Sequence, residues 1–173
     1  MNYSVDNIHK ICEVYGITNY TINADGSIDV DGDVDLWSRG LSELPVKFNH
    51  VSGDFYCHYN KLTTLLGSPQ SVGGNFECSF NNLTKLDGSP ERVGSHFYCD
   101  YNNLTTLEGG PQSVGNFICS GNNLTTLEFT PNSIGGYFDF SYNPIYDELG
   151  DIDYNSYIKQ LNRDKILNEL LSR

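Results

Sequence analysis

Basic residues are scarce in this sequence: it has 10 Lys and Arg against 22 Asp and Glu, a formal net charge of -12. Nucleic acids and anionic membranes normally bind Lys and Arg patches, so they should repel such a chain. No apolar run approaches the length of a membrane span, and polar residues follow Met1 where a signal sequence would place apolar ones. We therefore expect neither nucleic acid nor membrane as a partner, and retention in the compartment of synthesis.

Disulfide and catalytic motifs are also missing. The five cysteines are odd in number and lack C-x-x-C spacing, which fits a reducing cytoplasm better than a disulfide scaffold. The sequence has no phosphate-cradling glycine loop with lysine, no G-x-S-x-G elbow and no His-carboxylate metal motif. These absences predict a protein that is not an enzyme and needs no cofactor or metal.

Internal repetition is what the sequence has in abundance. "FYCHYNKLTTL", which begins at residue 55, returns as "FECSFNNLTKL", "FYCDYNNLTTL" and "FICSGNNLTTL" at a spacing of 20 or 21 residues. The most regular column contains Asn60, Asn81, Asn102, Asn122 and Asn143. With a degenerate unit that starts at Val30, the repeat predicts about six coils over residues 30–143.

Each unit predicts one turn of a thin solenoid. Phe and Cys alternate with period two, which favours a short strand with both side chains turned inward. The asparagine then turns the chain, and its side-chain amide bonds backbone groups that the strand leaves unpaired. The Gly- and Pro-rich return is too short for a helix, so we expect an extended or polyproline-like path and parallel strands on one face.

The two ends differ from the repeats, and we expect them to cap a single folding domain. Residues 1–29 predict an N-terminal cap, with a helix from the N-cap Ser4 to Gly16 and a β-hairpin at "NADGS". Residues 144–173 predict a C-terminal helical cap. Its expected apolar side contains Ile158, Leu161, Ile166, Leu167, Leu170 and Leu171.

The unit "VGNFICSGNNL" follows the leucine-rich-repeat pattern, apolar-x-x-apolar-x-apolar-x-x-Asn-x-Leu. Together with "VGGNFECSFNNLTKLDGSP" and the "NPIYDEL" exit, it resembles the short leucine-rich-repeat proteins encoded by many bacteriophages, from about Tyr20 to Asn143. "GLSELP" is similar to repeats of secreted bacterial effectors, but the chain is too short for their ubiquitin-ligase domain. The resemblance implies an α/β leucine-rich-repeat solenoid of viral origin and little about activity.

The cysteine column does not predict a metal or catalytic site. Cysteines on successive coils stand about 4.8 Å apart in a line, so four of them cannot converge on one ion at about 2.3 Å. Strand alternation turns Cys57 and Cys99 inward and His58 and His96 outward, which denies them a nucleophile-base contact. "NADGSIDVDGDVD" lacks two ligands of a calcium loop and predicts a solvated acidic edge, a part of a binding face or a weak cation site.

The outward positions of the strands differ from coil to coil, whereas the inward columns scarcely vary. This contrast is typical of a recognition surface, on which aromatic side chains bury area and carboxylates discriminate by charge. The predicted protein-binding residues are Asp33, Asp35, Trp37, Asp54, Tyr56, His58, Glu77, His96, Tyr98, Asp100, Ile118, Tyr137 and Asp139. Beside the asparagines, Tyr59, Phe80, Tyr101 and Tyr142 form an aromatic rim that either stacks between coils or binds a partner.

The leading hypothesis is a phage-encoded interaction module that works in the host cytoplasm. It would bind and inhibit a host bacterial protein that is basic or handles nucleic acid. Two alternatives remain open: a structural or assembly component of the virion, and an inhibitor whose carboxylates mimic the charge of DNA. The sequence leaves the identity of the partner and the oligomeric state undetermined.

Overall fold

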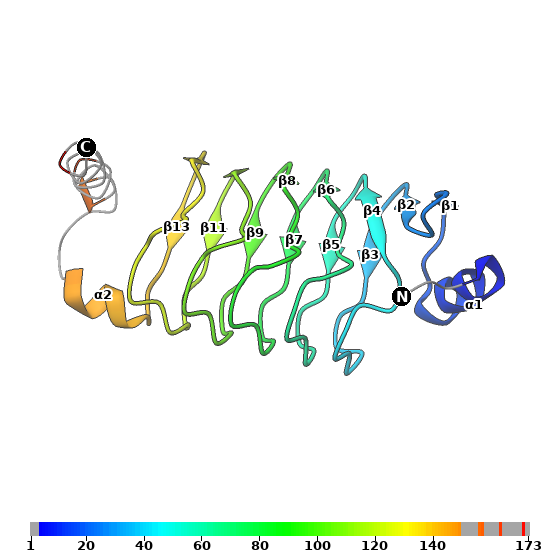
Figure 1. Ribbon diagram of the computed structural model, residues 1–173, viewed down its shortest axis with the longest axis horizontal. Coiled ribbons are helices and arrows are strands. Elements are labelled where there is room, and N and C mark those ends of the chain that lie inside the picture. The colour runs from blue at the N-terminus through cyan, green and yellow to red at the C-terminus, as the bar shows by residue number, and fades with distance from the viewer. Residues whose placement is uncertain (1–3, 150–155, 158–162, 164–170, 172–173) are drawn as a thin grey trace.

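The protein is a β-solenoid of about five stacked turns with few helices (Figure 1). The structure, a computed structural model, describes residues 4–149, 156–157, 163 and 171. The elements are α1 (Val5–Tyr15), β1 (Tyr20–Ile22), β2 (Ile28–Val30), β3 (Val34–Asp35), β4 (Phe48–Val51), β5 (Phe55–Tyr56), β6 (Ser71–Val72), β7 (Phe76–Glu77), β8 (Arg92–Val93), β9 (Phe97–Tyr98), β10 (Ser113–Val114), β11 (Phe117–Ile118), β12 (Ser133–Ile134), β13 (Phe138–Asp139) and α2 (Pro144–Leu149).

Each repeat contributes strands to two sheets. The Phe sheet is parallel throughout, in the order β13-β11-β9-β7-β5-β3. The Val sheet has the order β1-β2-β4-β6-β8, and the parallel pair β10-β12 carries the same repeat position onward. The expected parallel strands on one face are present as the Phe sheet, but the expectation of strands on that face alone was wrong. The end of the return segment also forms a strand, which pairs with the same segment of the adjacent coil, as Val51 does with Val72. The backbone N–H and C=O groups of this segment need hydrogen-bond partners, and the adjacent coil provides them.

The core consists of inward columns, as the alternation predicted. Phe55, Phe76, Phe97 and Phe117 are fully buried, and successive rings lie 5.2 to 5.6 Å apart between centroids. The cysteines of the same strands are also fully buried. These are Cys57, Cys78, Cys99 and Cys119. The interior is therefore a continuous stack that each coil fills with the same set of side chains.

The asparagine column holds neighbouring coils together through its buried amides. The Nδ2 group of Asn81 donates to the carbonyl oxygens of Cys57 at 3.0 Å and Cys78 at 3.1 Å, which lie on adjacent coils. Its Oδ1 atom accepts from the backbone amide of Leu62 at 2.9 Å. Asn102, Asn122 and Asn143 repeat this arrangement. The predicted bonding of the asparagine to backbone groups is confirmed.

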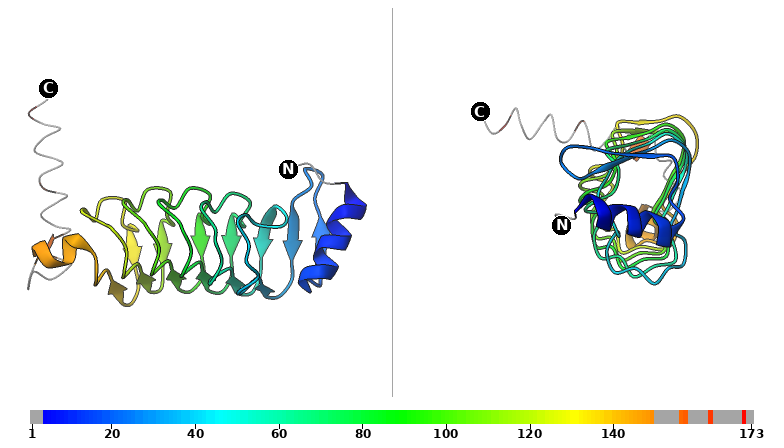
Figure 2. Two further views of the ribbon diagram at one scale, coloured as in Figure 1. Left: turned by 90° about the horizontal axis from the view of Figure 1, so that it is seen from below. Right: turned by 90° about the vertical axis from the view of Figure 1, so that its right-hand side faces the viewer.

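The N-terminal helix and hairpin are present. Helix α1 begins after Ser4, whose side chain accepts from the amide of Asn7, and ends at Gly16 in the left-handed conformation. It lies across one end of the solenoid (Figure 2), where Ile8 and Cys12 are buried. Strands β1 and β2 pair antiparallel, and β2 pairs with β4 of the first repeat.

At the other end, α2 follows the last asparagine and buries Ile145 and Leu149. The predicted helical residues Ile158, Leu161, Ile166, Leu167 and Leu170 lie outside the described residues, whereas Leu171 is described and exposed. In the part of the chain that the structure describes, no helix is long and apolar enough to cross a membrane.

Candidate binding face

The Phe sheet presents its outward side chains in three columns, one residue from each coil. The strand register pairs Asp35 with Tyr56, Tyr56 with Glu77, and Glu77 with Tyr98, which defines the central column. The columns are Asp33, Asp54, Asn75, His96, Asn116 and Tyr137; then Asp35, Tyr56, Glu77, Tyr98, Ile118 and Asp139; then Trp37, His58, Ser79, Asp100, Ser120 and Ser141. All thirteen predicted binding residues belong to these columns, which we call the outward face.

The first column is engaged in holding the coils together. Asp33 Oδ1 accepts from the backbone amide of Asp54 at 2.8 Å, and Asn75 Oδ1 accepts from the amide of His96 at 3.1 Å. The ladder continues as His96 Nδ1 accepts from the amide of Asn116 at 2.9 Å. The sequence analysis missed this structural role. The sequence does indicate it, because most residues in the column are Asp, Asn or His. These short side chains carry a hydrogen-bond acceptor close to the backbone.

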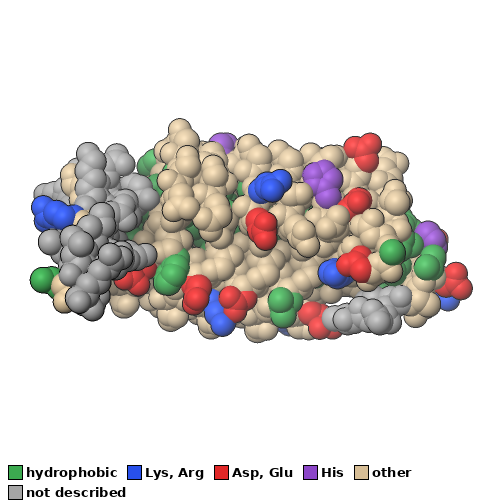
Figure 3. Space-filling model, turned by 45° about the horizontal axis from the view of Figure 1, so that its top comes forward, with side chains coloured by type: hydrophobic (Ala, Val, Ile, Leu, Met, Phe, Trp, Pro, Cys, Tyr) green, Lys and Arg blue, Asp and Glu red, His purple; other side chains and the backbone are tan. Residues whose placement is uncertain are grey.

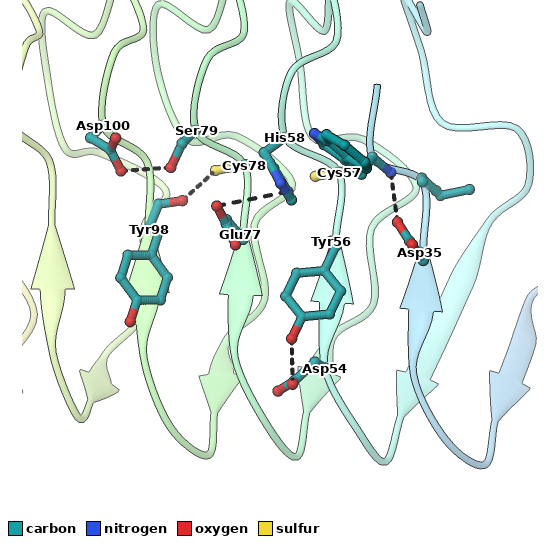
Figure 4. Close-up of polar contacts among 12 residues, drawn as sticks. Asp35, Asp54, Tyr56, Cys57, His58, Glu77, Cys78, Ser79, Tyr98 and Asp100 are labelled. Atoms are coloured by element: carbon teal, nitrogen blue, oxygen red, sulfur yellow. Dashed lines mark hydrogen bonds and ion pairs between the residues drawn. The ribbon is translucent and has the colours of Figure 1, made fainter. Parts of the chain in front are cut away.

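Toward the β3 end, the face contains an imidazole between an indole and a carboxylate. The rings of Trp37 and His58 stack with centroids 6.0 Å apart, and His58 Nδ1 lies 3.7 Å from Glu77 Oε1 (Figure 4). That separation is too long for a hydrogen bond, and the buried Nδ1 atom has no hydrogen-bond partner among the described residues. Nearby, Ser79 Oγ donates to Asp100 at 2.6 Å.

Burial changes the acidity of groups on this face. Desolvation raises the pKa of Glu77, which His58 partly counteracts and the charge of Asp100 reinforces. Desolvation likewise raises the pKa of Asp100, against the lowering effect of the Ser79 hydrogen bond. The Tyr56 hydroxyl donates to Asp54 at 2.6 Å, and this bond, with burial, raises the pKa of Tyr56 to about 12. Burial therefore disfavours the charged forms of Glu77 and Asp100, at a cost to the stability of the fold.

This cost predicts a pH dependence that Glu77→Gln removes. Because the folded-state pKa of Glu77 is raised, the folded state binds more protons than the unfolded state between the two pKa values, so stability falls as pH rises through that window, above 4.5. We expect Glu77→Gln to raise the Tm at pH 7 by roughly 2 °C and to flatten its pH profile. Thermal unfolding from pH 4 to 8 measures the Tm of this variant, with Glu91→Gln, at an exposed position, as the control. If the Tm of both variants depends on pH in the same way, the predicted role of Glu77 is wrong.

The thiols are placed away from the imidazoles. Desolvation raises the pKa of Cys57, Cys78 and Cys99, all of which are fully buried, whereas His58 belongs to the outward face. A raised pKa keeps a thiol protonated and weakly nucleophilic. Among the residues that the structure describes, no group of three or more His, Cys, Asp and Glu side chains is placed to hold a metal ion.

In the acidic segment near the hairpin, Asp25, Asp29 and Asp31 each contact a different partner residue. Asp25 pairs with Lys47 at 2.6 Å, and the hydrogen bond from Lys47 is the main reason that the pKa of Asp25 is lowered. Asp29 accepts from the Asn49 amide at 2.7 Å, and Asp31 accepts from the Ser52 hydroxyl at 3.0 Å. Each carboxylate thus joins neighbouring coils. In Figure 3 the acidic side chains are likewise spread along the face in view, with Lys and Arg among them.

An aromatic ladder runs beside the outward face, formed by Tyr59, Phe80 and Tyr101. Its rings stack with centroids 4.3 and 4.6 Å apart, which confirms the stacking alternative for these three residues. All three have a positive φ between 50° and 54°, in the left-handed region that bulky residues seldom adopt. The sequence signal for this conformation is Gly121, which takes the same place in the next coil with φ of 65°.

Comparisons with protein-family models, with curated proteins and with solved structures found no match for this chain.

Proposed function

We propose that this chain is a non-enzymatic, leucine-rich-repeat interaction module of phage origin. It binds and inhibits a host bacterial protein in the host cytoplasm through the outward face. The observation that carries the proposal is the contrast between the two sides of the same strands. Phe76, Phe97 and Phe117 repeat without change inside, whereas their outward neighbours Glu77, Tyr98 and Ile118 all differ. Packing accounts for the inner column, and recognition accounts for the outer one.

The side chains available on this face favour a basic partner. Trp37 is 54% exposed and Tyr137 63% exposed, so aromatic area is free at both ends of the face. Asp35 and Asp139 lie on the end strands β3 and β13 of the same sheet. Large aromatic side chains beside carboxylates bury area at low entropic cost and attract Lys and Arg, as interface centres commonly do. A basic or nucleic-acid-binding protein has the complementary charge.

Affinity capture with matched variants tests the proposal. Tagged wild-type protein should retain a basic host protein from bacterial lysate, and Tyr56→Ala/Tyr98→Ala should retain at least about tenfold less, as expected when aromatic anchors are lost. The control is Gln70→Ala/Glu91→Ala, which changes exposed residues next to the Val sheet. Thermal unfolding of each variant separates lost binding from lost folding, and Trp37→Ala provides a second, exposed variant. Equal retention by the face and control variants would refute the proposal.

The same material distinguishes the alternative functions. A virion component would be abundant in purified phage particles, whereas an inhibitor would stay in the lysate. A mimic of DNA charge would be displaced from its partner by DNA, with a steep dependence on salt. A partner that is retained at moderate salt and not displaced by DNA favours the inhibitor.

A further inference from the structure

The aromatic ladder has a missing rung. The ladder position is occupied in chain order by Ser38, Tyr59, Phe80, Tyr101, Gly121 and Tyr142, all with positive φ. Three consecutive rings stack, then Gly121 supplies no ring, and Tyr142 follows with 79% of its surface exposed. A Cβ built on Gly121 would lie 2.8 to 3.3 Å from three ring carbons of Tyr101. The Tyr101 ring therefore leans over the Gly121 position and has to tilt away before another group can enter.

With the Tyr101 ring tilted away from Gly121, the gap has the width of one flat group. Adjacent coils of a parallel ladder are about 4.8 Å apart, so Tyr101 and Tyr142, two coils apart, are separated by about 9.6 Å. A planar group halfway between them would lie about 4.8 Å from each ring position. The existing ladder stacks its rings at 4.3 and 4.6 Å, so the missing rung matches the spacing that the protein already uses.

The charge of this part of the sequence favours one kind of flat group. Between Arg92 and Lys159 the sequence contains no Lys or Arg and eight Asp or Glu. Asp139 lies on β13, and Asp147 of α2 lines the same surface hollow as Tyr142. A planar cation satisfies both the shape and the charge. Among protein side chains, arginine is the one that stacks its flat cationic head on aromatic faces, whereas the compact lysine ammonium does not.

We propose that the open position at Gly121, between Tyr101 and Tyr142, binds the guanidinium of an arginine side chain on a basic partner protein. The inference deepens the proposed function and rests on it, because it identifies which side chain of a basic partner the chain recognises. It lies beside the outward face, between two residues of the predicted aromatic rim.

Peptides of equal charge test the site. The full chain is titrated by calorimetry with hexa-arginine and with hexa-lysine at the same salt concentration. We expect wild-type protein to bind hexa-arginine about tenfold more tightly, as expected for a cation stacked on two aromatic rings. Tyr142→Ser should reduce this preference to less than about twofold and leave the affinity for hexa-lysine unchanged. Gly121→Tyr should do the same by filling the position, for which the Tyr101 ring must tilt away.

Each outcome decides one proposal. No arginine preference in wild-type protein, or a preference that survives Tyr142→Ser, overturns the arginine site. Tyr142 is exposed, so this variant decides the question even where Gly121→Tyr does not fold. Tyr56→Ala/Tyr98→Ala should keep the arginine preference while losing capture of the host protein. If these face variants alone lose capture and the peptides show no preference, the arginine site is wrong and the proposed function stands.

Discussion

Asn102→Ala is expected to lower the free energy of unfolding by roughly 2–4 kcal/mol. The Asn102 side chain accepts from the Leu83 amide at 3.0 Å and donates to the carbonyls of Cys78 and Cys99 at 3.0 and 3.2 Å. Alanine leaves the Leu83 amide buried without its acceptor, and an unsatisfied buried group costs about 1–3 kcal/mol. Each of the two carbonyls keeps one asparagine donor from an adjacent position, which limits the loss.

The next residue provides the control for this variant. Asn103 has the same chemistry, but its side chain is exposed and its backbone amide donates to the Leu83 carbonyl. Asn103→Ala should therefore change the free energy of unfolding by less than about 0.5 kcal/mol. Urea denaturation of both variants measures the difference. Equal stability of Asn102→Ala and wild type would contradict the account of the asparagine column.

Phe97→Ala is expected to lower the free energy of unfolding by about 3–5 kcal/mol, the usual cost of deleting a buried ring. Phe97 is fully buried, and its ring lies 5.2 Å from that of Phe76 and 5.6 Å from that of Phe117. In a solenoid each coil contacts only its neighbours, so the cavity is flanked by two rings that the backbone ladders hold in place. The neighbouring side chains therefore cannot move far enough to fill the cavity.

The outward Tyr137 serves as the comparison for this core substitution. It is an aromatic residue of similar size on the same sheet, 63% exposed. Tyr137→Ala should change the free energy of unfolding by less than about 0.5 kcal/mol. The measurement is again urea denaturation. Similar losses from Phe97→Ala and Tyr137→Ala would mean that the inner and outer columns do not differ as described.

The repeat made much of the fold predictable. Alternation of Phe55 and Cys57 around Tyr56 fixed which side chains face inward, because strand side chains alternate strictly between two faces. An asparagine such as Asn81 follows the repeated strands. This position predicted a turn in which the side-chain amide forms hydrogen bonds with the backbone. Both inferences depend only on local geometry, and the repeat allowed each to be checked against several copies.

Features that depend on contact between coils were harder to predict. In the Val sheet, β6 and β8 each bury a single residue, Val72 and Val93, so no alternation of buried residues marks them in the sequence. The acceptor role of His96 depends on an amide twenty residues later. The left-handed conformation of Tyr59 and Phe80 contradicts their intrinsic preference, and it persists because the ring stack and the asparagine turn fix the backbone there.

The same short strands carry the buried side chains that stabilise the fold and the outward side chains proposed to bind a partner. A substitution therefore tests binding without loss of stability only if it changes an outward side chain. Substitutions at Phe76 or Asn81 should unfold the coil, whereas substitutions at Trp37 or Tyr137 should leave it intact. Tyr56 is intermediate, because its hydroxyl bonds to Asp54. A loss of binding in exposed variants that keep the wild-type Tm is therefore the informative result.

Carboxylate footprinting of the complex tests the central claim most directly. The wild-type chain, alone and bound to the captured host protein, is labelled with a carbodiimide and mapped by mass spectrometry. We predict that labelling of Asp33, Asp35 and Asp139 on the outward face falls on binding, while labelling of the exposed Glu43 and Glu91 elsewhere does not change. Protection of Glu43 or Glu91 with unchanged labelling of the three aspartates would contradict the account.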